Sequence, residues 1–256
     1  ELAGVTIRKA TLNNWGDVQK KRVRVGCRVF LRRSNDVIPE ILGRVDEAEP
    51  DERDVTYPTV CPACGAPTEF RGANLYCTGR DCKPRIVAEL AHFASRDAMD
   101  IETFSEKTAE LFHDELGVRD PADLYSLEHG RLILLPGMGD KKASNLLSAI
   151  EKSKTRPLDA FLFALGVPGV GRKTARDVAR KFGTLEKIRE ADETTLAEIP
   201  DVGDIIAQNI VEFFRDEEQI ASIERMLAAG VTPAPVETAA DGVFSGKTVV
   251  VTGTLA

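Results

Sequence analysis

The sequence predicts a multidomain α+β protein built from several small modules, and three observations support this. Short β-rich segments fill residues 1–54, four of the five cysteines lie between residues 61 and 82, and a nine-residue motif recurs through a helical region. With 256 residues, of which 43 % are hydrophobic, the chain is long enough for two or more compact cores. The predicted modules are a small antiparallel β-barrel over 1–54, a cysteine knuckle over 55–85, an all-α repeat array over 86–232, a linker over 233–243 and a further strand over 244–256.

The predicted barrel consists of four short segments rich in strand-forming residues, separated by turn signals. The segments are 5–7, 23–25, 28–32 and 41–45. Residues 1–45 carry ten Lys or Arg against four acidic residues, although the whole chain has a net charge of −7. A small basic barrel favours an OB-type fold, whose groove binds oligonucleotides, with an SH3-like barrel as the alternative. The pattern leaves open whether the first strand of such a barrel is included.

The cysteine knuckle has two short loops, with Cys61 and Cys64 in one and Cys77 and Cys82 in the other. Four thiolates in facing loops suit the tetrahedral preference of zinc, and a site closed by four sulfurs has no open position for catalysis. The alternative is a pair of disulfides. The pattern therefore predicts one structural zinc ion per chain, and it favours a reducing, intracellular location.

The helical region contains four copies of a motif in which apolar residues alternate with turn residues before a helix. The copies start at residues 101, 135, 167 and 199. The second and third have two turn glycines each, the fourth has Asp201 in place of its first glycine, and the first has Thr103 and Ser105 instead of both. TPR repeats share the period but lack the paired glycines. The pattern is that of a helix-hairpin-helix.

A hairpin of this kind ends at a helix N-terminus, where free N–H groups and the helix dipole favour a phosphate. Cations are disfavoured in a first helical turn unless an anion is bound there, so lysines and arginines at these positions point to the DNA backbone. The first copy is interpreted as structural, and Gly169→Val is expected to weaken DNA binding with little change in fold. The expected DNA-contacting residues of the array are Gly137, Gly139, Lys141, Gly169, Gly171, Arg172, Lys173 and Gly203.

No catalytic constellation is predicted from the residues. The three histidines stand apart from cysteines and carboxylates at metal-ligand spacing. The Gly- and Lys-containing sequences at 137–142 and 245–248 lack the strand-to-helix context of a dinucleotide-binding fold or a P-loop. No apolar run approaches the length of a membrane span.

The order of these modules strongly resembles the carboxy-terminal part of bacterial-type NAD-dependent DNA ligases. The resemblance rests on four sequence segments, residues 9–14, 32–39, 92–100 and 244–253. The resemblance covers essentially the whole chain. It implies that residues 244–256 are the first strand of a truncated BRCT domain. The chain lacks the family's K-x-D-G sequence, so the adenylylation domain is expected to lie outside this fragment, which alone would be inactive.

The resemblance implies a function in joining 3′-hydroxyl and 5′-phosphate ends of nicked duplex DNA, through enzyme-AMP and DNA-adenylate intermediates, with NAD and Mg²⁺ bound mainly outside this fragment. This chain would be the part that encircles the nick, independently of sequence, in a cytoplasmic, nucleoid-associated monomer. In the barrel, Arg33 would contact phosphate, Val37 and Ile38 the sugars, and Thr11 a further DNA position. The family usually has a histidine where Asn13 stands, so that role is not carried over.

Two other interpretations remain open. One is a non-catalytic, zinc-containing DNA-binding scaffold, and the other is an excision-repair or nuclease subunit with tandem hairpins. A K-x-D-G lysine encoded upstream would distinguish a ligase from both.

Overall fold

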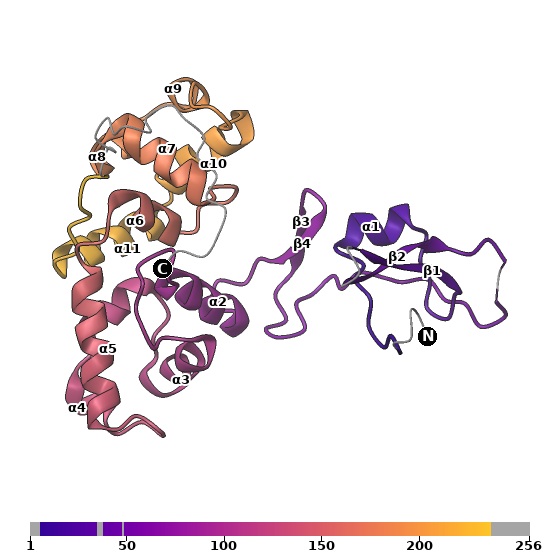
Figure 1. Ribbon diagram of the computed structural model, residues 1–256, viewed down its shortest axis with the longest axis horizontal. Helices are drawn as coiled ribbons and strands as arrows, with labels where there is room; N and C mark the ends of the chain where they lie inside the picture. Colours follow the sequence, from indigo (N-terminus) through magenta and orange to yellow (C-terminus); the bar gives the residue numbers. More distant parts are fainter. Residues whose placement is uncertain (1–5, 35–37, 48, 237–256) are drawn as a thin grey trace, which may run out of the picture. The chain divides into compact units, whose positions relative to one another are not determined.

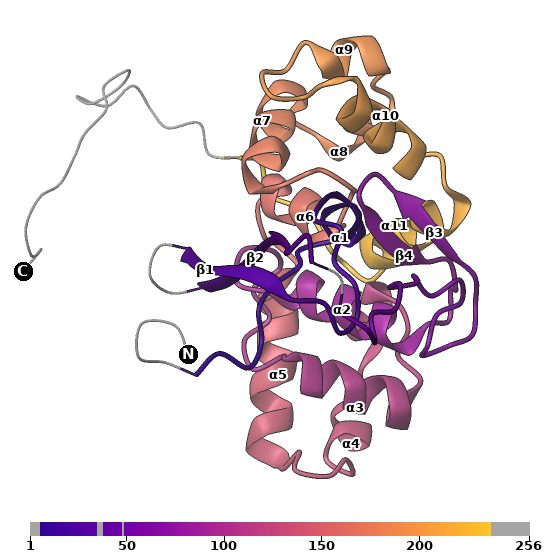
Figure 2. The same cartoon turned by 90° about the vertical axis from the view of Figure 1, so that its right-hand side faces the viewer.

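The computed structural model describes residues 6–34, 38–47 and 49–236, and the chain forms two compact units, residues 1–83 and 84–256 (Figures 1 and 2). The first unit combines a short helix with two small antiparallel sheets. In the second unit, the described residues form helices joined by turns.

The basic segment of the first unit contains an antiparallel ribbon of two strands, β1 (Val29–Ser34) and β2 (Ile38–Arg44). These strands confirm the predictions made for 28–32 and 41–45. Of the other two predicted segments, the described residues of 5–7 form no strand, and 23–25 contributes a single antiparallel bridge from Val25 to Arg53.

A helix that the sequence analysis missed, α1 (Trp15–Lys20), begins directly after the Asn13-Asn14 pair. The Asn14 backbone is extended, and its side chain accepts a hydrogen bond from the Asp17 N–H at 2.9 Å, as an N-cap does. The polar residues that suggested a turn between strands therefore start a helix, because turns and N-caps favour the same side chains.

The acidic residue Glu52 anchors the end of this module. Its side chain is only 3 % exposed, and its two carboxylate oxygens accept hydrogen bonds from the Arg44 guanidinium at 2.6 and 3.2 Å. Arg24 lies 3.7 Å away. Glu52 therefore ties β2 to the segment before the cysteine knuckle.

The knuckle itself carries a second antiparallel hairpin, β3 (Thr68–Arg71) and β4 (Asn74–Cys77). Its contact with α1 is aromatic. The Tyr57 ring meets Trp15 edge-on at a centroid distance of 5.5 Å and Phe70 at 5.0 Å. Edge-to-face contacts of this kind contribute about 0.5–1.5 kcal/mol each beyond area burial.

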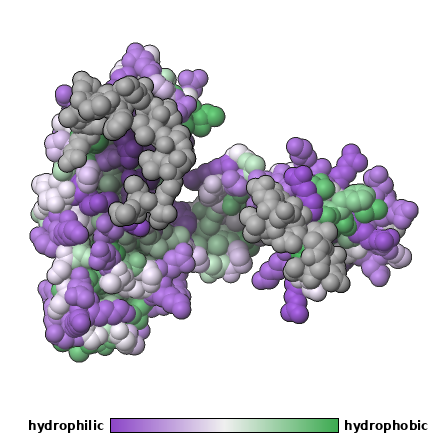
Figure 3. All heavy atoms as spheres, in the orientation of Figure 1, coloured by the Kyte–Doolittle hydropathy of each residue, from purple (hydrophilic) through white to green (hydrophobic). Residues whose placement is uncertain are grey.

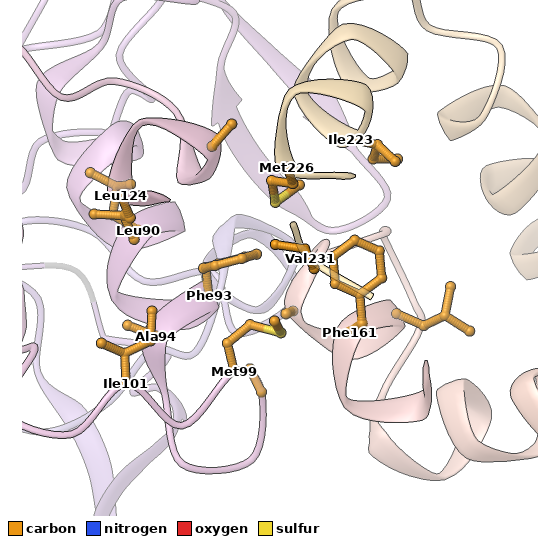
Figure 4. Packing of buried hydrophobic residues seen from close by; sticks show 14 of the residues in the cluster. Leu90, Phe93, Ala94, Met99, Ile101, Leu124, Phe161, Ile223, Met226 and Val231 are labelled. Carbon is orange, nitrogen blue, oxygen red and sulfur yellow. The ribbon is translucent and has the colours of Figure 1, made fainter. Parts of the chain in front are cut away.

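The second unit is an assembly of helices around one continuous hydrophobic cluster. Figure 4 shows how Phe93, Phe161 and Met226, from early, middle and late helices, converge in it. Because each element buries one face in this cluster, the helices from 84 to 236 form one body. The elements are α2 (Lys83–Ala94), α3 (Glu106–Leu116), η1 (Pro121–Ser126), α4 (His129–Leu132), α5 (Asp140–Ser153), α6 (Leu158–Ala164), α7 (Arg172–Phe182), α8 (Leu185–Arg189), α9 (Glu193–Ala197), α10 (Asp204–Phe213) and α11 (Glu217–Ala228).

After α11 the chain returns to the junction between α5 and α6. The N–H of Thr232 donates to the carbonyl of Lys154 at 2.8 Å, and the Leu158 N–H donates to the Ala234 carbonyl at 2.8 Å. Residues 233–236, the first part of the segment predicted as a linker, are thus held against the helical unit. The remainder of that segment and the strand predicted over 244–256 lie outside the described residues.

The Glu52 contacts predict a pH-dependent stability for the first unit. Burial opposes its ionisation, but the Arg44 guanidinium and the Glu49 N–H outweigh burial, so the pKa of Glu52 is lowered from its ordinary value of 4.5. Its stabilising effect is present above pH 4.5 and is lost as the pH falls through the lowered value. We expect the melting temperature of this unit to drop on acidification below that point. In Glu52→Gln the drop should be smaller; an unchanged profile would assign the acid sensitivity to other carboxylates.

Candidate metal centre and nucleic-acid interface

The four cysteines of the knuckle come together in space. Their sulfur atoms all lie within 4.8 Å of one another, with 3.4 Å between Cys64 and Cys77 and 3.9 Å between Cys61 and Cys82. These separations are far longer than the roughly 2.05 Å of a disulfide. They match the edges of a tetrahedron around an ion about 2.3 Å from each sulfur. The donor set therefore fits a metal ion, and it rules out the disulfide alternative.

The backbone around the sulfurs is shaped for such a site. Gly65 has φ of +74° in the turn that closes on the Cys61 carbonyl, and the Gly79 N–H donates to the Cys77 sulfur at 3.2 Å. A Cβ added at Gly79 would lie 2.9 Å from the Cys64 sulfur. Only a glycine at this position leaves space for the sulfur cluster.

The sulfurs differ in how easily they ionise. N–H groups of Ala63 and Cys64 lower the pKa of Cys61 to about 6. At Cys77 the Gly79 N–H acts in the same direction, but partial burial and the neighbouring sulfurs outweigh it and raise the pKa to about 12. A cluster of thiolates repels itself, so a bound cation is what allows all four to lose their protons.

Among the described side chains of the first unit, only those of Cys61 and Cys82 are buried. Phe70, Tyr76 and Val60 are exposed nearby. The knuckle therefore has almost no hydrophobic core of its own, and the sulfur cluster occupies the place where a core would be.

The four predicted hairpins share one backbone geometry. We number them hairpin 1 (101–109), hairpin 2 (135–143), hairpin 3 (167–175) and hairpin 4 (199–207). The third residue of each is left-handed, with φ of +68° at Thr103, +70° at Gly137, +81° at Gly169 and +66° at Asp201. Threonine and aspartate adopt this conformation at a steric cost that glycine avoids. The two degenerate copies are therefore structurally equivalent to the complete ones.

The hairpins differ at their fifth residue, which is the N-cap of the following helix. In hairpin 1 the Ser105 hydroxyl accepts the Thr108 N–H at 3.4 Å, so this helix caps itself. Gly139, Gly171 and Gly203 provide no side-chain cap to α5, α7 and α10. Their φ angles are negative, and a Cβ added at any of them would meet no atom within 4 Å. The fold does not require these glycines, and their effect is to leave the first N–H groups of three helices uncovered.

Two of the three uncovered helices, α5 and α7, have cationic side chains in their first turn, as predicted. Lys141 is the second residue of α5, and Arg172 and Lys173 open α7. Arg172 is paired with Asp97, and Lys173 with Asp201 of hairpin 4, which raises the pKa of Lys173. Within the described part of the chain, Lys141 has no such partner.

Hairpins 3 and 4 pack against each other. The Asn209 side chain of α10 donates to the Pro168 carbonyl of hairpin 3 at 2.9 Å. On α5, Asn145 holds the position corresponding to Asn209 and lines a cavity together with Thr103 of hairpin 1. The four hairpins thus associate as two successive pairs.

This packing corrects one prediction. A Cβ at Gly169 would lie 3.3 Å from the Ile206 Cγ1 atom, and its φ of +81° is unfavourable for valine. Gly169→Val would therefore strain the hairpin itself, so it is not a substitution that leaves the fold unchanged.

The predicted contacts of the barrel lie around the connection between β1 and β2. Arg33 is on β1 and Ile38 starts β2, while Val37 lies outside the described residues. Thr11 is brought beside them: its N–H donates to the Pro39 carbonyl at 3.1 Å.

Paired helix hairpins with uncovered N-termini place the second unit in the helix-hairpin-helix class of DNA-binding proteins. Comparison with protein families agrees. Residues 95–152 match a SAM-like helix-hairpin-helix tandem, residues 160–223 match a helix-hairpin-helix motif, and residues 1–53 match the OB-fold domain of NAD-dependent DNA ligases. The first two matches coincide with the two hairpin pairs.

Relatives match the whole chain. It is 54 % identical to a DNA ligase of Alkaliphilus metalliredigens, 52 % to one of Alkaliphilus oremlandii and 50 % to one of Clostridium perfringens, each over 257 aligned positions that cover 100 % of this chain. The chain spans 39 % of the length of each of these relatives. It therefore corresponds to the OB-fold and helix-hairpin-helix part of DNA ligases. Among the described residues, no helix is long and apolar enough to cross a membrane.

The contact between Gly79 and the sulfurs predicts that Gly79→Ala weakens metal binding. The added methyl group would displace the Cys64 sulfur, and disturbing the surroundings of a metal site typically costs about 10–100-fold in affinity. Titration with Zn²⁺ against a chromophoric chelator would measure the change. Gly130→Ala, where a Cβ has open space, is the control; equal affinities for both variants would contradict this role of Gly79.

Proposed function

We propose that this chain is the DNA-binding, nick-encircling part of an NAD-dependent DNA ligase. The observation that carries the proposal is the set of three glycine-capped helix starts, in a chain that matches DNA ligases over its whole length. The parent enzyme joins 3′-hydroxyl and 5′-phosphate ends through enzyme-AMP and DNA-adenylate intermediates, with NAD and Mg²⁺ as cofactors. This part supplies affinity and positioning, and the adenylylation chemistry takes place elsewhere in the parent.

The partner in this proposal is nicked double-stranded DNA, bound independently of sequence. Uncovered helix N-termini recognise phosphate, which every nucleotide carries. In the helical unit, the proposed contacts are the paired glycines and first-turn cations of hairpins 2 and 3, together with Gly203 of hairpin 4: Gly137, Gly139, Lys141, Gly169, Gly171, Arg172, Lys173 and Gly203. Thr11, Arg33, Val37 and Ile38 are the proposed contacts of the barrel. The protein acts as a monomer, in the cytoplasm, at the nucleoid.

The proposed metal is one structural zinc ion per chain, held by Cys61, Cys64, Cys77 and Cys82. Sulfur-only coordination suits zinc, and four protein ligands leave no position for a substrate. The ion would order the knuckle and would take no part in ligation.

The proposed interface predicts that Gly171→Ser weakens DNA binding while the fold is retained. The new hydroxyl would cover the N–H groups of α7 as Ser105 covers those of α3. Hydrogen bonds to charged groups contribute about 1.5–3 kcal/mol, so we expect a loss of roughly tenfold or more. Fluorescence anisotropy with a labelled nicked duplex would measure it. In the whole ligase the same change should raise KM for nicked DNA and leave self-adenylylation unaffected.

Ser105→Gly is the matched control, because it opens a hairpin that we consider structural. Its DNA affinity should stay close to that of the unmodified chain. Unaltered binding by Gly171→Ser would remove hairpin 3 from the interface, and a sealing defect without a binding defect would contradict the clamp.

Metal removal gives an independent prediction. Because Cys61 and Cys82 are the buried residues among the described side chains of the first unit, chelation should disorder residues 55–83 while the helices of 84–236 persist. Hydrogen exchange measured with and without a chelator would locate the change. Full protection of β3 and β4 without metal would show that the sulfur cluster does not hold the knuckle together.

A further inference from the structure

The helical unit keeps nearly all of its large apolar side chains inside. Among described residues 84–236, only three large hydrophobic side chains are classed as exposed: Ile133, Leu134 and Ile205. The two most exposed are Leu134 at 81 % and Ile205 at 76 %. Figure 3 shows the visible surface of the helical unit as mostly hydrophilic to neutral, with an apolar group projecting at its upper right edge.

All three exposed residues adjoin hairpin turns. Ile133 and Leu134 directly precede Leu135, the first residue of hairpin 2, and Ile205 is the second residue of α10, after the uncovered cap of hairpin 4. Leu135 and Met138 are buried and already supply the apolar residues that fix hairpin 2, as Ile199 and Val202 do for hairpin 4. The exposed residues are thus additional to the packing of the hairpins.

The other three hairpins have a lysine at the position that Ile205 takes in hairpin 4. The second residue of the helix is Lys107 in hairpin 1, Lys141 in hairpin 2 and Lys173 in hairpin 3. Hairpin 4 also carries Asp201 where hairpins 2 and 3 have glycine, so two changes in this hairpin make its tip less positive. Asp201 is paired with Lys173, so hairpin 4 presents an isoleucine beside its uncovered helix start where the other hairpins present a lysine, and this suits apolar contact more than ionic contact.

We propose that Leu134 and Ile205 are apolar DNA contacts that pack on the deoxyribose faces next to the phosphates bound by hairpins 2 and 4. This rests on the proposed function and adds a second kind of recognition to it. Between successive phosphates, duplex DNA presents the C–H surface of its sugars, which is the same for every sequence. Apolar side chains against that surface add affinity without reading bases, as the proposed sequence-independent partner requires.

Apolar and ionic contacts can be separated by their salt dependence. A lost lysine–phosphate contact reduces the slope of log affinity against log salt by about one, because one counterion fewer is released. A lost apolar contact lowers affinity at all salt concentrations and leaves the slope unchanged. Anisotropy titrations of the whole chain with a labelled nicked duplex, between about 50 and 200 mM KCl, resolve the two effects.

We expect Leu134→Ser and Ile205→Ser each to lower affinity by roughly fivefold, from partial loss of apolar burial, with the slope of the unmodified chain. Ile205→Lys should increase the slope by about one. Lys141→Ala is the contrasting variant, and its slope should fall. Circular dichroism should show the same helix content for all variants, since both side chains are solvent-exposed.

Unchanged affinity in both serine variants would overturn the inference. So would a change in sedimentation without a change in DNA binding, because the apolar side chains would then cover a second copy of the chain. If Lys141→Ala and Gly171→Ser are also without effect, the proposed function fails as well. If those two weaken binding and the serine variants do not, only the apolar contacts are refuted.

Discussion

The helical unit depends on one backbone constraint, a residue with positive φ near the start of each hairpin. This residue turns the chain so sharply that the next helix begins three residues later, with its first N–H groups outside the turn. Thr103 and Asp201 hold the same conformation as Gly137 and Gly169, so the buried and half-buried apolar residues on either side determine it. The fold does not require glycine at the N-cap, because hairpin 1 has Ser105 at this position. The three N-cap glycines instead leave the helix N-termini accessible to a ligand.

The first unit follows a different principle. Its ribbon and its knuckle are too small to enclose a hydrophobic core, and described side chains such as Phe30, Phe70 and Tyr76 remain exposed. Small modules of this kind need a cross-link in place of a core. The first unit is stabilised instead by three kinds of interaction: the cluster of four sulfurs, the Glu52–Arg44 ion pair and the aromatic contacts of Tyr57. The ion pair depends on pH, and the sulfur cluster would depend on the proposed metal ion, unlike the apolar cluster in the helical unit.

The features that could be predicted from the sequence are local. Metal-binding loops and hairpin turns have short, fixed spacings, so Cys61–Cys82 and the motif at Gly137 and Gly169 were recognisable without a structure. The start of α1 was missed because Asn14 suits a turn and a cap equally well. The ion pairs of Glu52 and Asp201 were missed for another reason. Their partners, Arg44 and Lys173, are brought to them by packing that no spacing reveals.

The pairing of Arg172 and Lys173 with Asp97 and Asp201 has a consequence for how this surface meets its target. Charges that are already neutralised project little field beyond a Debye length, so they attract a distant polyanion weakly. At contact, a phosphate can displace the carboxylates and take over the cations. Such a surface is poor at capturing any stretch of duplex that diffuses past and good at retaining one that already fits. Weak long-range attraction therefore shortens each encounter with duplex that does not fit this surface.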